Sequence, residues 1–287
     1  MFTSHITTVQ YYYEVISDGK DQIWFLETSY RNTLTAREAC SIESACKHNP
    51  NHTVHLLSTG NIQNAGCPYH NILSSIGNLK SLSIEVNAVL EETPLGKLYK
   101  SGAVKSHPYA VSHLSDFLRY AVLWYKGGIY LDTDVIVMRS LGGLRNSAVY
   151  EEDGSVVASS VLFFDAGHHI MWAAMDKCAR GYKATRWTTC GPDVMSFVHE
   201  NNTLGRTITF LKSTTFVAVK YWLWQHLFLP VRLAWVLETT NGSYGVHFWN
   251  KLSKEQHVVP GSHCAMDVLA KEHCPRVYKL ASSYQYF

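Results

Sequence analysis

The sequence lacks a hydrophobic run long enough to cross a membrane. A membrane-spanning helix needs about 20 consecutive apolar residues, and residues 1–22 contain no such run. The longest apolar stretch, Phe216–Leu237, is interrupted by Lys220, Pro230 and Arg232, so it also fails as a spanning segment. We expect residues 1–21 to form an N-terminal extension without a membrane anchor.

The sequence also lacks an excess of charge of one sign. Its 25 Lys and Arg residues nearly balance 23 Asp and Glu residues, which leaves a net charge of +2. There is no basic run and no aromatic RNA-binding signature, so we do not expect a nucleic-acid partner.

Several motifs with well-understood chemistry are absent. The sequence has no Gly-x-Ser-x-Gly, no Gly-Lys-Ser/Thr phosphate loop, no Gly-x-Gly-x-x-Gly and no His-Glu-x-x-His. These absences argue against an α/β-hydrolase, a P-loop nucleotidase, a dinucleotide-binding enzyme and a zinc protease.

The sequence contains seven cysteines, an odd number, and no Cys-x-x-Cys spacing. This pattern argues against a zinc site. Cys264 and Cys274 are close in sequence, and we predict that they lie close enough to bond in an oxidising compartment. Cys178 with Cys190 is a second possible pair. Free buried thiols are the alternative to both.

The most informative segment present is Ser115–Val137, which we predict to be a helix, a Gly127-Gly128 stop and a strand. On the helix, Asp116 and Arg119 share one face. On the strand, predicted over Gly128–Val137, Tyr130, Asp132 and Asp134 share one face. Neighbouring carboxylates at the end of a buried strand need a compensating cation, and a divalent metal that holds a diphosphate meets that need.

This segment closely resembles the sugar-binding region of family 32 glycosyltransferases, whose DXD motif holds a metal and a nucleotide-sugar. More narrowly, the chain resembles the animal α1,4-glycosyltransferases. Four further segments carry the same resemblance: Ile23–Ser29, Ala36–Ala45, Cys190–Asp193 and Val246–Asn250.

The resemblance implies an α/β, GT-A fold with a mostly parallel central sheet flanked by helices in a single domain. Alternating strand and helix patterns along the 287 residues agree with this class. Residues 22–140 would form the nucleotide-sugar-binding half with the DXD motif, and residues 141–287 the acceptor-binding half of the same catalytic domain.

The resemblance also implies an activity. We expect a retaining transferase that uses Mn²⁺ or Mg²⁺ and a UDP-sugar, with galactose favoured, and that acts on a glycolipid or glycan acceptor in glycosphingolipid biosynthesis. Its family members resemble type II proteins of the Golgi membrane with a lumenal catalytic domain. The membrane contact would come through a missing anchor or through the acceptor.

By resemblance, each site residue receives an expected role. Asp134 is expected to ligate the metal directly, Asp132 to contact the ribose or the metal, and His247 to add a metal or diphosphate contact. Further donor-side contacts are expected from Asp116, Arg119, Tyr130, Trp24 and Trp249, with core packing as the alternative for Trp24. The indole of Trp249 is expected to donate to the diphosphate.

The acceptor side is less well marked. Gly191 and Asp193 are expected to shape it. Ala158-Ser159 stands where close relatives have Asn-Gly, and this mismatch argues against carrying over the relatives' acceptor and sugar in full. Aromatic residues between Phe216 and Leu237 are expected to line an acceptor platform, lean on a membrane surface or pack in the core. Asn51, Asn201 and Asn241 begin Asn-x-Ser/Thr sequons, which are glycosylated only in a secretory lumen.

Three other functions stay open at this point. The alternatives are a catalytically inactive binder of glycan or nucleotide-sugar, a nucleotide-sugar hydrolase, and an α1,4-N-acetylgalactosaminyl- or N-acetylglucosaminyltransferase. The intact Asp132-Thr-Asp134 argues against the inactive binder, because such a domain is free to lose these acids.

Overall fold

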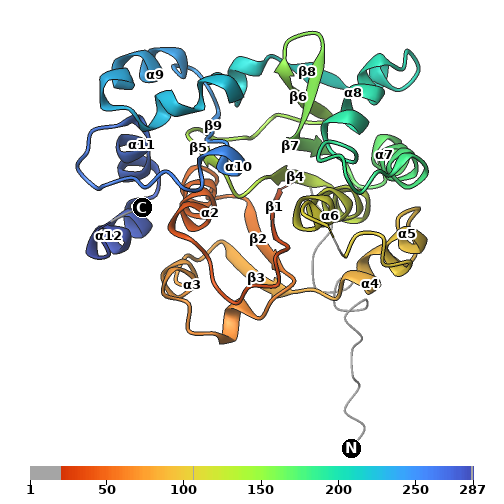
Figure 1. Ribbon diagram of the computed structural model, residues 1–287, viewed down its shortest axis with the longest axis horizontal. Helices are drawn as coiled ribbons and strands as arrows, with labels where there is room; N and C mark the ends of the chain where they lie inside the picture. The colour runs from red at the N-terminus through yellow and green to blue at the C-terminus, as the bar shows by residue number, and fades with distance from the viewer. Residues whose placement is uncertain (1–20, 106, 286) are drawn as a thin grey trace, which may run out of the picture.

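The computed structural model describes residues 21–105, 107–285 and 287, and residues 1–20 of the expected N-terminal extension lie outside this range. A seven-stranded sheet in the order β3-β2-β1-β4-β7-β6-β8 forms the centre of the molecule (Figure 1). Its strands are β1 (Gln22–Glu27), β2 (Thr53–Ser58), β3 (Leu79–Ser83), β4 (Gly128–Leu131), β6 (Ser147–Glu152), β7 (Val156–Phe164) and β8 (Thr209–Leu211). Only β7 is antiparallel to its neighbours, which confirms the mixed, mostly parallel sheet.

The central strands are buried on both faces. In β1, Ile23 and Phe25 enter one core while Trp24 and Leu26 enter the other, as the two-residue period of a strand requires. A strand covered on both sides reads as a continuous apolar run, which is why Ile23–Leu26 contains no polar residue.

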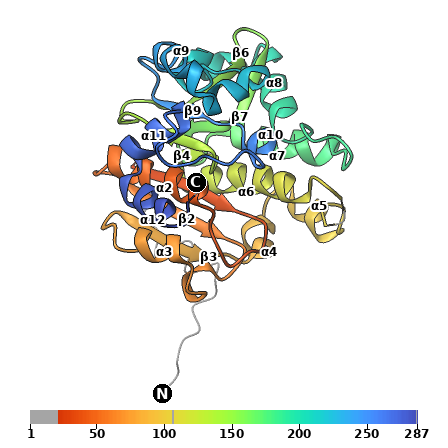
Figure 2. The same cartoon turned by 60° about the vertical axis from the view of Figure 1, so that its left-hand side comes forward.

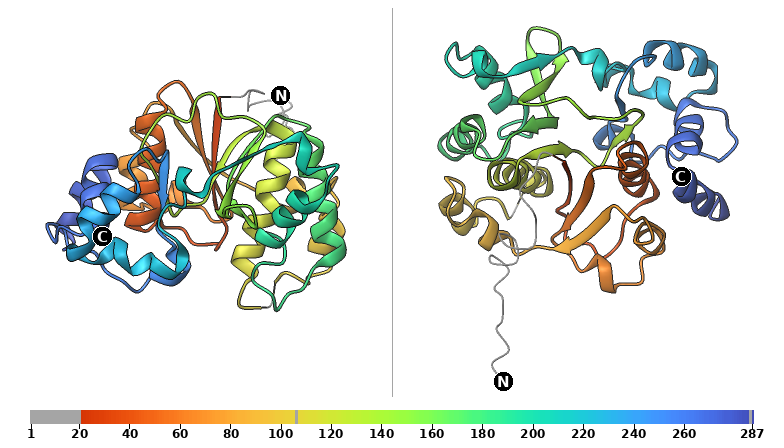
Figure 3. Two further views of the ribbon diagram at one scale, coloured as in Figure 1. Left: turned by 90° about the horizontal axis from the view of Figure 1, so that it is seen from above. Right: turned by 180° about the vertical axis from the view of Figure 1, so that it is seen from behind.

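Two layers of helices cover the sheet, one on each face (Figure 3). On the first face lie α2 (Ala36–His48), α3 (Pro68–Leu73), α11 (Ala265–His273) and α12 (Pro275–Ser283). On the second lie α4 (Val86–Leu90), α5 (Gly96–Lys100), α6 (Ala110–Lys126), α7 (His169–Gly181) and α8 (Pro192–Glu200). The C-terminal helices therefore return to pack beside α2 (Figure 2).

The DXD segment interrupts its strand instead of lying within it. The main-sheet strand β4 ends at Leu131, and the chain turns before β5 (Val135–Val137) begins. That strand pairs with β9 (Gly245–His247) in a separate two-stranded sheet, with Val135 opposite His247. The prediction of one strand over Gly128–Val137 was therefore wrong, because the second half changes partner.

Gly127 and Gly128 are required where α6 meets β4. Both have positive φ, 64° and 99°, a region that other residues seldom adopt. A Cβ on Gly128 would lie 2.5 Å from the carbonyl oxygen of Gln22, so the strand can pair closely with β1 only if this residue has no side chain.

The disulfides confirm one expected pair and correct another. Cys178 is bonded to Cys190, as considered, but Cys274 is bonded to Cys40 on α2. The predicted Cys264–Cys274 bond was wrong: these residues cap opposite ends of α11, which a rise of about 1.5 Å per residue keeps far apart. Cys264 is a buried free thiol.

No helix among the described residues is long and apolar enough to cross a membrane. The apolar stretch forms short elements, which are η4 (Tyr221–Phe228), η5 (Pro230–Arg232) and α9 (Leu233–Thr239). Phe228 packs in the core, whereas Tyr221, Trp222 and Val231 are exposed. The aromatics of this stretch thus divide between core and surface.

A buried histidine makes the fold sensitive to acid. His55 stacks on Trp24 with ring centroids 4.3 Å apart, and burial lowers the pKa of His55 to about 3. Because this pKa lies below the ordinary value of 6.5, the contribution of neutral His55 to folding stability is complete above pH 6.5 and is lost as pH falls. We predict that His55 alone costs about 2 kcal/mol of folding free energy between pH 7.5 and pH 5.

Urea unfolding at both pH values tests this expectation. The His55→Phe variant retains a stacking ring but cannot be protonated, so its loss of stability between the two pH values should be about 2 kcal/mol smaller. Equal losses in the two proteins would contradict the assignment.

Candidate active site

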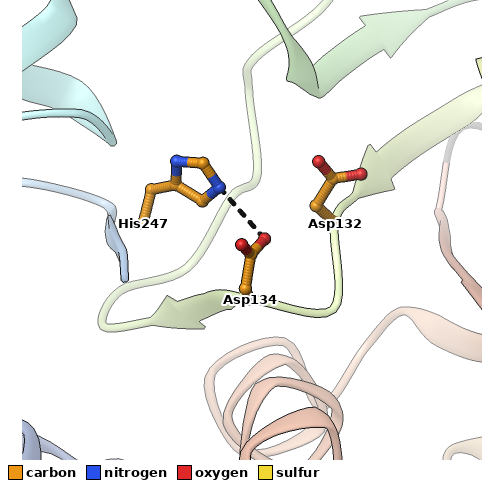
Figure 4. A group of neighbouring side chains, drawn as sticks. All are labelled: Asp132, Asp134 and His247. Atoms are coloured by element: carbon orange, nitrogen blue, oxygen red, sulfur yellow. Dashed lines mark hydrogen bonds and ion pairs between the residues drawn. The ribbon is translucent and has the colours of Figure 1, made fainter. Parts of the chain in front are cut away.

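Asp132, Asp134 and His247 converge at the break between β4 and β5 (Figure 4). Each offers one ligand atom, and these atoms lie within 4.8 Å of one another. The two carboxylates come from one turn of the chain, and the imidazole comes from the end of β9, which pairs directly with β5. The second sheet thus brings together residues that are 113 positions apart.

Backbone and side-chain contacts hold Asp134 in place. One carboxylate oxygen lies 3.0 Å from Nε2 of His247, and the other accepts a hydrogen bond of 2.8 Å from the backbone N–H of Asn250. Asn250 begins the short helix α10 (Asn250–Ser253). These contacts orient Asp134 before any ligand arrives.

The pKa values of Asp132 and Asp134 are shifted in opposite directions. Burial raises the pKa of Asp132, and the neighbouring Asp134 raises it further against the opposing charge of Arg119. Burial would also raise the pKa of Asp134, but His247 and backbone N–H groups lower it on balance. Burial likewise disfavours a charged His247, but the charges of Asp134 and Asp132 raise its pKa. Negative charge thus concentrates where a cation would bind.

Arg119 is the second organising group of the site. Its guanidinium donates to the backbone oxygen of Ser159 at 2.7 Å and to Oγ of Ser115 at 3.0 Å. It also lies 3.1 Å from the carboxylate of Asp132 and 3.3 Å from that of Asp116. Each guanidinium nitrogen therefore has a protein acceptor. Its contacts fit a role in holding both acids, and the expected contact with the donor sugar stays a prediction.

Asp116, expected on the donor side, lies beside Gly191, expected on the acceptor side. A Cβ on Gly191 would come within 2.9 Å of Oδ1 of Asp116 and 2.7 Å of Oγ of Ser159, so a side chain at this position would displace one or both of these polar groups. Burial raises the pKa of Asp116 to about 7, with Arg119 opposing the shift. Asp193 is half-buried, forms an ion pair with Arg186 at 2.6 Å and is absent from the pocket lining.

A pocket of about 390 Å³ surrounds the acidic cluster. Its lining includes Asp116, Arg119, Asp132, Asp134, His247 and Trp249, so tertiary structure brings most of the expected site residues to one cavity. The volume falls in the range of small-molecule sites.

The pocket also contains residues that sequence reasoning missed. Glu27 is the last residue of β1 and Glu151 belongs to β6, and both line the cavity together with Ser160. Among the described residues, Oε2 of Glu27 and Oγ of Ser160 are buried without a hydrogen-bond partner. Ligands of open α/β sheets bind beyond the carboxyl ends of strands, so the position of Glu27 at the carboxyl end of the first strand was the signal available. Buried polar atoms without partners indicate a polar ligand.

Three aromatic residues expected at the nucleotide are engaged by protein. Trp24 is fully buried and donates its indole N–H to the carbonyl of Gly127 at 2.7 Å, which favours the core-packing alternative. The hydroxyl of Tyr130 lies 2.5 Å from the carboxylate of Asp132, beneath the guanidinium of Arg119. Trp249 lines the pocket, but its indole N–H donates to the carbonyl of Val219 at 2.8 Å. The expected donation from Trp249 to a diphosphate is therefore corrected.

The sequon asparagines differ in exposure. Asn51 and Asn241 are exposed, and Asn201 is half-buried at the C-terminal end of α8. The side-chain oxygen of Asn201 accepts backbone hydrogen bonds from Thr203 and Leu204 at 3.0 Å. Asn51 and Asn241 are therefore more accessible to a modifying enzyme than Asn201 is.

Comparison with known families identifies the chain. The glycosyltransferase sugar-binding region containing the DXD motif matches residues 35–154, and the alpha 1,4-glycosyltransferase conserved region matches residues 163–281. The chain belongs to the α1,4-glycosyltransferase family with a DXD sugar-binding region. The two matched regions together span both halves of the expected catalytic domain.

Curated relatives agree with this family. Mouse lactosylceramide 4-alpha-galactosyltransferase is 28% identical over 275 residues, covering 91% of this chain and 76% of the relative. Human alpha-1,4-N-acetylglucosaminyltransferase is also 28% identical, over 93% of this chain and 82% of the relative. Their names specify different sugars, so the similarity identifies the family and leaves the substrate open.

Solved structures support the fold. The PaToxG glycosyltransferase superposes with a TM-score of 0.52 at 15% identity, covering 98% of this chain and 94% of that one. The bifunctional WbbM glycosyltransferase gives 0.53 at 14% identity, over 92% of this chain and 52% of that one. The expected GT-A-like fold is confirmed.

The ligand atoms that Asp132, Asp134 and His247 offer in this glycosyltransferase fit a divalent metal. Two carboxylates and one imidazole within 4.8 Å offer the oxygen-rich set, with one nitrogen, that suits Mn²⁺, and the carboxylates also suit Mg²⁺. The unbalanced charge of Asp132 beside Asp134 gives the same indication, because a cation would relieve their repulsion.

We predict that Asp134→Asn weakens Mn²⁺ binding at least tenfold and lowers turnover on the order of a thousand-fold, because one charge leaves the cluster while the side-chain shape is kept. His247→Ala should have a smaller effect on both quantities, with little change in the apparent affinity for the acceptor. Titration calorimetry with Mn²⁺ and initial rates with and without chelator measure the two effects.

Asp176→Asn is the matched control, because Asp176 on α7 pairs with Arg180 on the surface and is absent from the pocket lining. An Asp134→Asn protein that stays active and ignores both Mn²⁺ and chelator would refute the metal-assisted interpretation.

Proposed function

We propose that this chain is a retaining transferase that moves a hexose from a UDP-sugar to a glycolipid or glycan in α1,4 linkage. The observation that carries the proposal is the convergence of Asp132, Asp134 and His247 in one pocket of a chain that belongs to the DXD α1,4-glycosyltransferases. Galactose is the favoured sugar, and N-acetylglucosamine and N-acetylgalactosamine are the alternatives.

The protein groups have separate roles in this proposal. Asp132, Asp134 and His247 would hold Mn²⁺ or Mg²⁺, which stabilises the negative charge that develops on the diphosphate as it leaves. Arg119 keeps the carboxylates of Asp132 and Asp116 in position by its ion pairs. The buried, unpaired oxygen of Glu27 is available to accept a hydrogen bond from the donor substrate.

The proposed compartment is the Golgi lumen. Disulfides persist in oxidising compartments, and the described residues contain two, Cys40–Cys274 and Cys178–Cys190. Exposed sequon positions at Asn51 and Asn241 agree with passage through a secretory lumen.

Contact with a membrane is part of the proposal for a glycolipid acceptor. Trp222 on η4, Leu229 between η4 and η5, and Val231 on η5 are exposed, Val231 to 89%. Tyr221 packs against Trp249 of the pocket, so this apolar surface begins near the site where an acceptor would bind. Tryptophan and aliphatic side chains are suited to a membrane interface.

An assay of UDP-sugar consumption tests the proposed reaction. We expect Mn²⁺-dependent consumption that requires an acceptor such as a β-galactoside, and UDP-galactose should be used faster than UDP-N-acetylglucosamine or UDP-N-acetylgalactosamine. Labelled sugar should appear on the acceptor in α linkage by NMR. Consumption that is equal without acceptor would indicate a hydrolase, and binding without consumption would indicate an inactive domain.

A further inference from the structure

A loop between α7 and α8 places Trp187 on the wall of the pocket. The indole is 42% exposed, whereas Trp249, the other aromatic residue of the lining, is 6% exposed. The loop is tied down at its end by the Cys178–Cys190 disulfide and by a hydrogen bond of 2.8 Å from Tyr120 to the carbonyl of Cys190. Trp187 is thus an accessible flat surface on a restrained segment.

A chain of hydrogen bonds connects this loop to the start of α6. The Nε2 atom of His107 lies 2.8 Å from the hydroxyl of Tyr182, and that hydroxyl lies 3.0 Å from Nδ1 of His113. At one end, the backbone N–H of Tyr109 points at Nδ1 of His107 at 3.1 Å. At the other end, Nε2 of His113 lies 3.2 Å from the carbonyl oxygen of Trp187.

The two ends fix the direction of every proton in this chain. Nε2 of His113 faces only carbonyl oxygens, those of Arg186 and Trp187, so it carries a proton. Nδ1 of His107 receives an N–H, so it carries none and Nε2 of His107 must donate. The Tyr182 hydroxyl then accepts from His107 and donates to His113. All groups are satisfied only when both imidazoles are neutral.

We propose that Trp187 stacks on a pyranose ring of the acceptor, and that the neutral His107–Tyr182–His113 chain positions it. This inference rests on the proposed transferase function. Asp116 and Arg119, on the donor side, are 5% and 4% exposed, whereas Trp187 lies at the open part of the pocket. An indole at the open part of the pocket is accessible to a substrate that arrives from solvent, and the apolar face of a sugar ring fits it.

Protonation would break the positioning chain. A proton on Nδ1 of His107 would face the N–H of Tyr109, and a proton on Nδ1 of His113 would leave the Tyr182 hydroxyl without its acceptor. Burial, and then the neighbouring His107, lower the pKa of His113. The neutral hydrogen-bond chain is therefore complete above the ordinary histidine pKa of 6.5 and is lost as pH falls.

The charged groups around the His107–Tyr182–His113 chain have other partners or leave its protons in place. The Lys251 ammonium lies over the ring of Tyr109 at 5.2 Å, and Arg186 is paired with Asp193. On the other side, burial and the charge of Asp116 raise the pKa of Tyr182 to about 12, so its hydroxyl keeps its proton at neutral pH.

Histidine ¹⁵N NMR on the intact protein tests the chain without any assay of activity. At pH 7.5 we expect both His107 and His113 as the Nε2–H tautomer, assigned by loss of each signal in the His107→Gln and His113→Gln variants. An Nδ1–H tautomer or a protonated ring at either position at this pH would overturn the proposed chain.

Kinetics test the role of Trp187. We expect Trp187→Ala to raise the acceptor KM about tenfold, as loss of about 1.4 kcal/mol of stacking requires, with the donor KM unchanged. Trp187→Phe should restore most of the affinity. Tyr182→Phe should raise the acceptor KM several-fold and flatten its dependence on pH between 7.5 and 5.5.

Tyr150→Phe is the matched control, because the Tyr150 hydroxyl also bonds a histidine, His199 at 2.7 Å, and Tyr150 is absent from the pocket lining. It should leave the acceptor KM and its pH dependence unchanged. An unchanged acceptor KM in Trp187→Ala, or a raised donor KM instead, would overturn the platform. Absence of turnover in the unmodified protein would refute the proposed function, whereas the NMR result would still decide the chain.

Discussion

Buried negative charge is the constraint that organises this molecule around its pocket. Asp116, Asp132 and Asp134 are drawn into one cavity, and a lone charge there would be costly. Arg119 offsets two of these carboxylates through its ion pairs, and His247 contacts the third. The arrangement is stable but not neutralised, since burial and Asp134 raise the pKa of Asp132. This residual imbalance suits the site to a divalent cation.

The break between β4 and β5 is what allows that cluster to form. If the strand had continued, alternate residues would have stayed beside their main-sheet neighbours. Instead β5 leaves to pair with β9, which brings His247 onto Asp134. Backbone hydrogen bonds from Asp132 to Ser160 and from Phe248 to Asp134 fix the two sides of the turn. The geometry of the metal-binding cluster therefore depends on the meeting of two sheets. Helix α6 supplies Arg119, whose guanidinium holds the carboxylate of Asp132.

Much of the fold was predictable because its signals are local. The alternation of strand and helix patterns indicated a mostly parallel sheet flanked by helices, and Gly127-Gly128 indicated the end of a helix. Resemblance to a family then placed His247 near the acids. The failures involve partners rather than elements: Cys274 pairs with Cys40, 234 residues away, and Trp249 donates to Val219. Spacing along the chain does not reveal which distant atom a side chain will meet.

The sequence by itself determined the family, the class of fold and the residues of the acidic motif, because residue identity and local periodicity carry that information. Only the tertiary structure decided that the strand breaks at Asp132–Asp134, that Arg119 is engaged by protein groups and that Glu27 and Trp187 line the pocket. The physical reason is that these outcomes depend on close packing and hydrogen-bond satisfaction between segments far apart in the chain. Local patterns specify which face of an element is buried, and the assembled core selects what that face contacts.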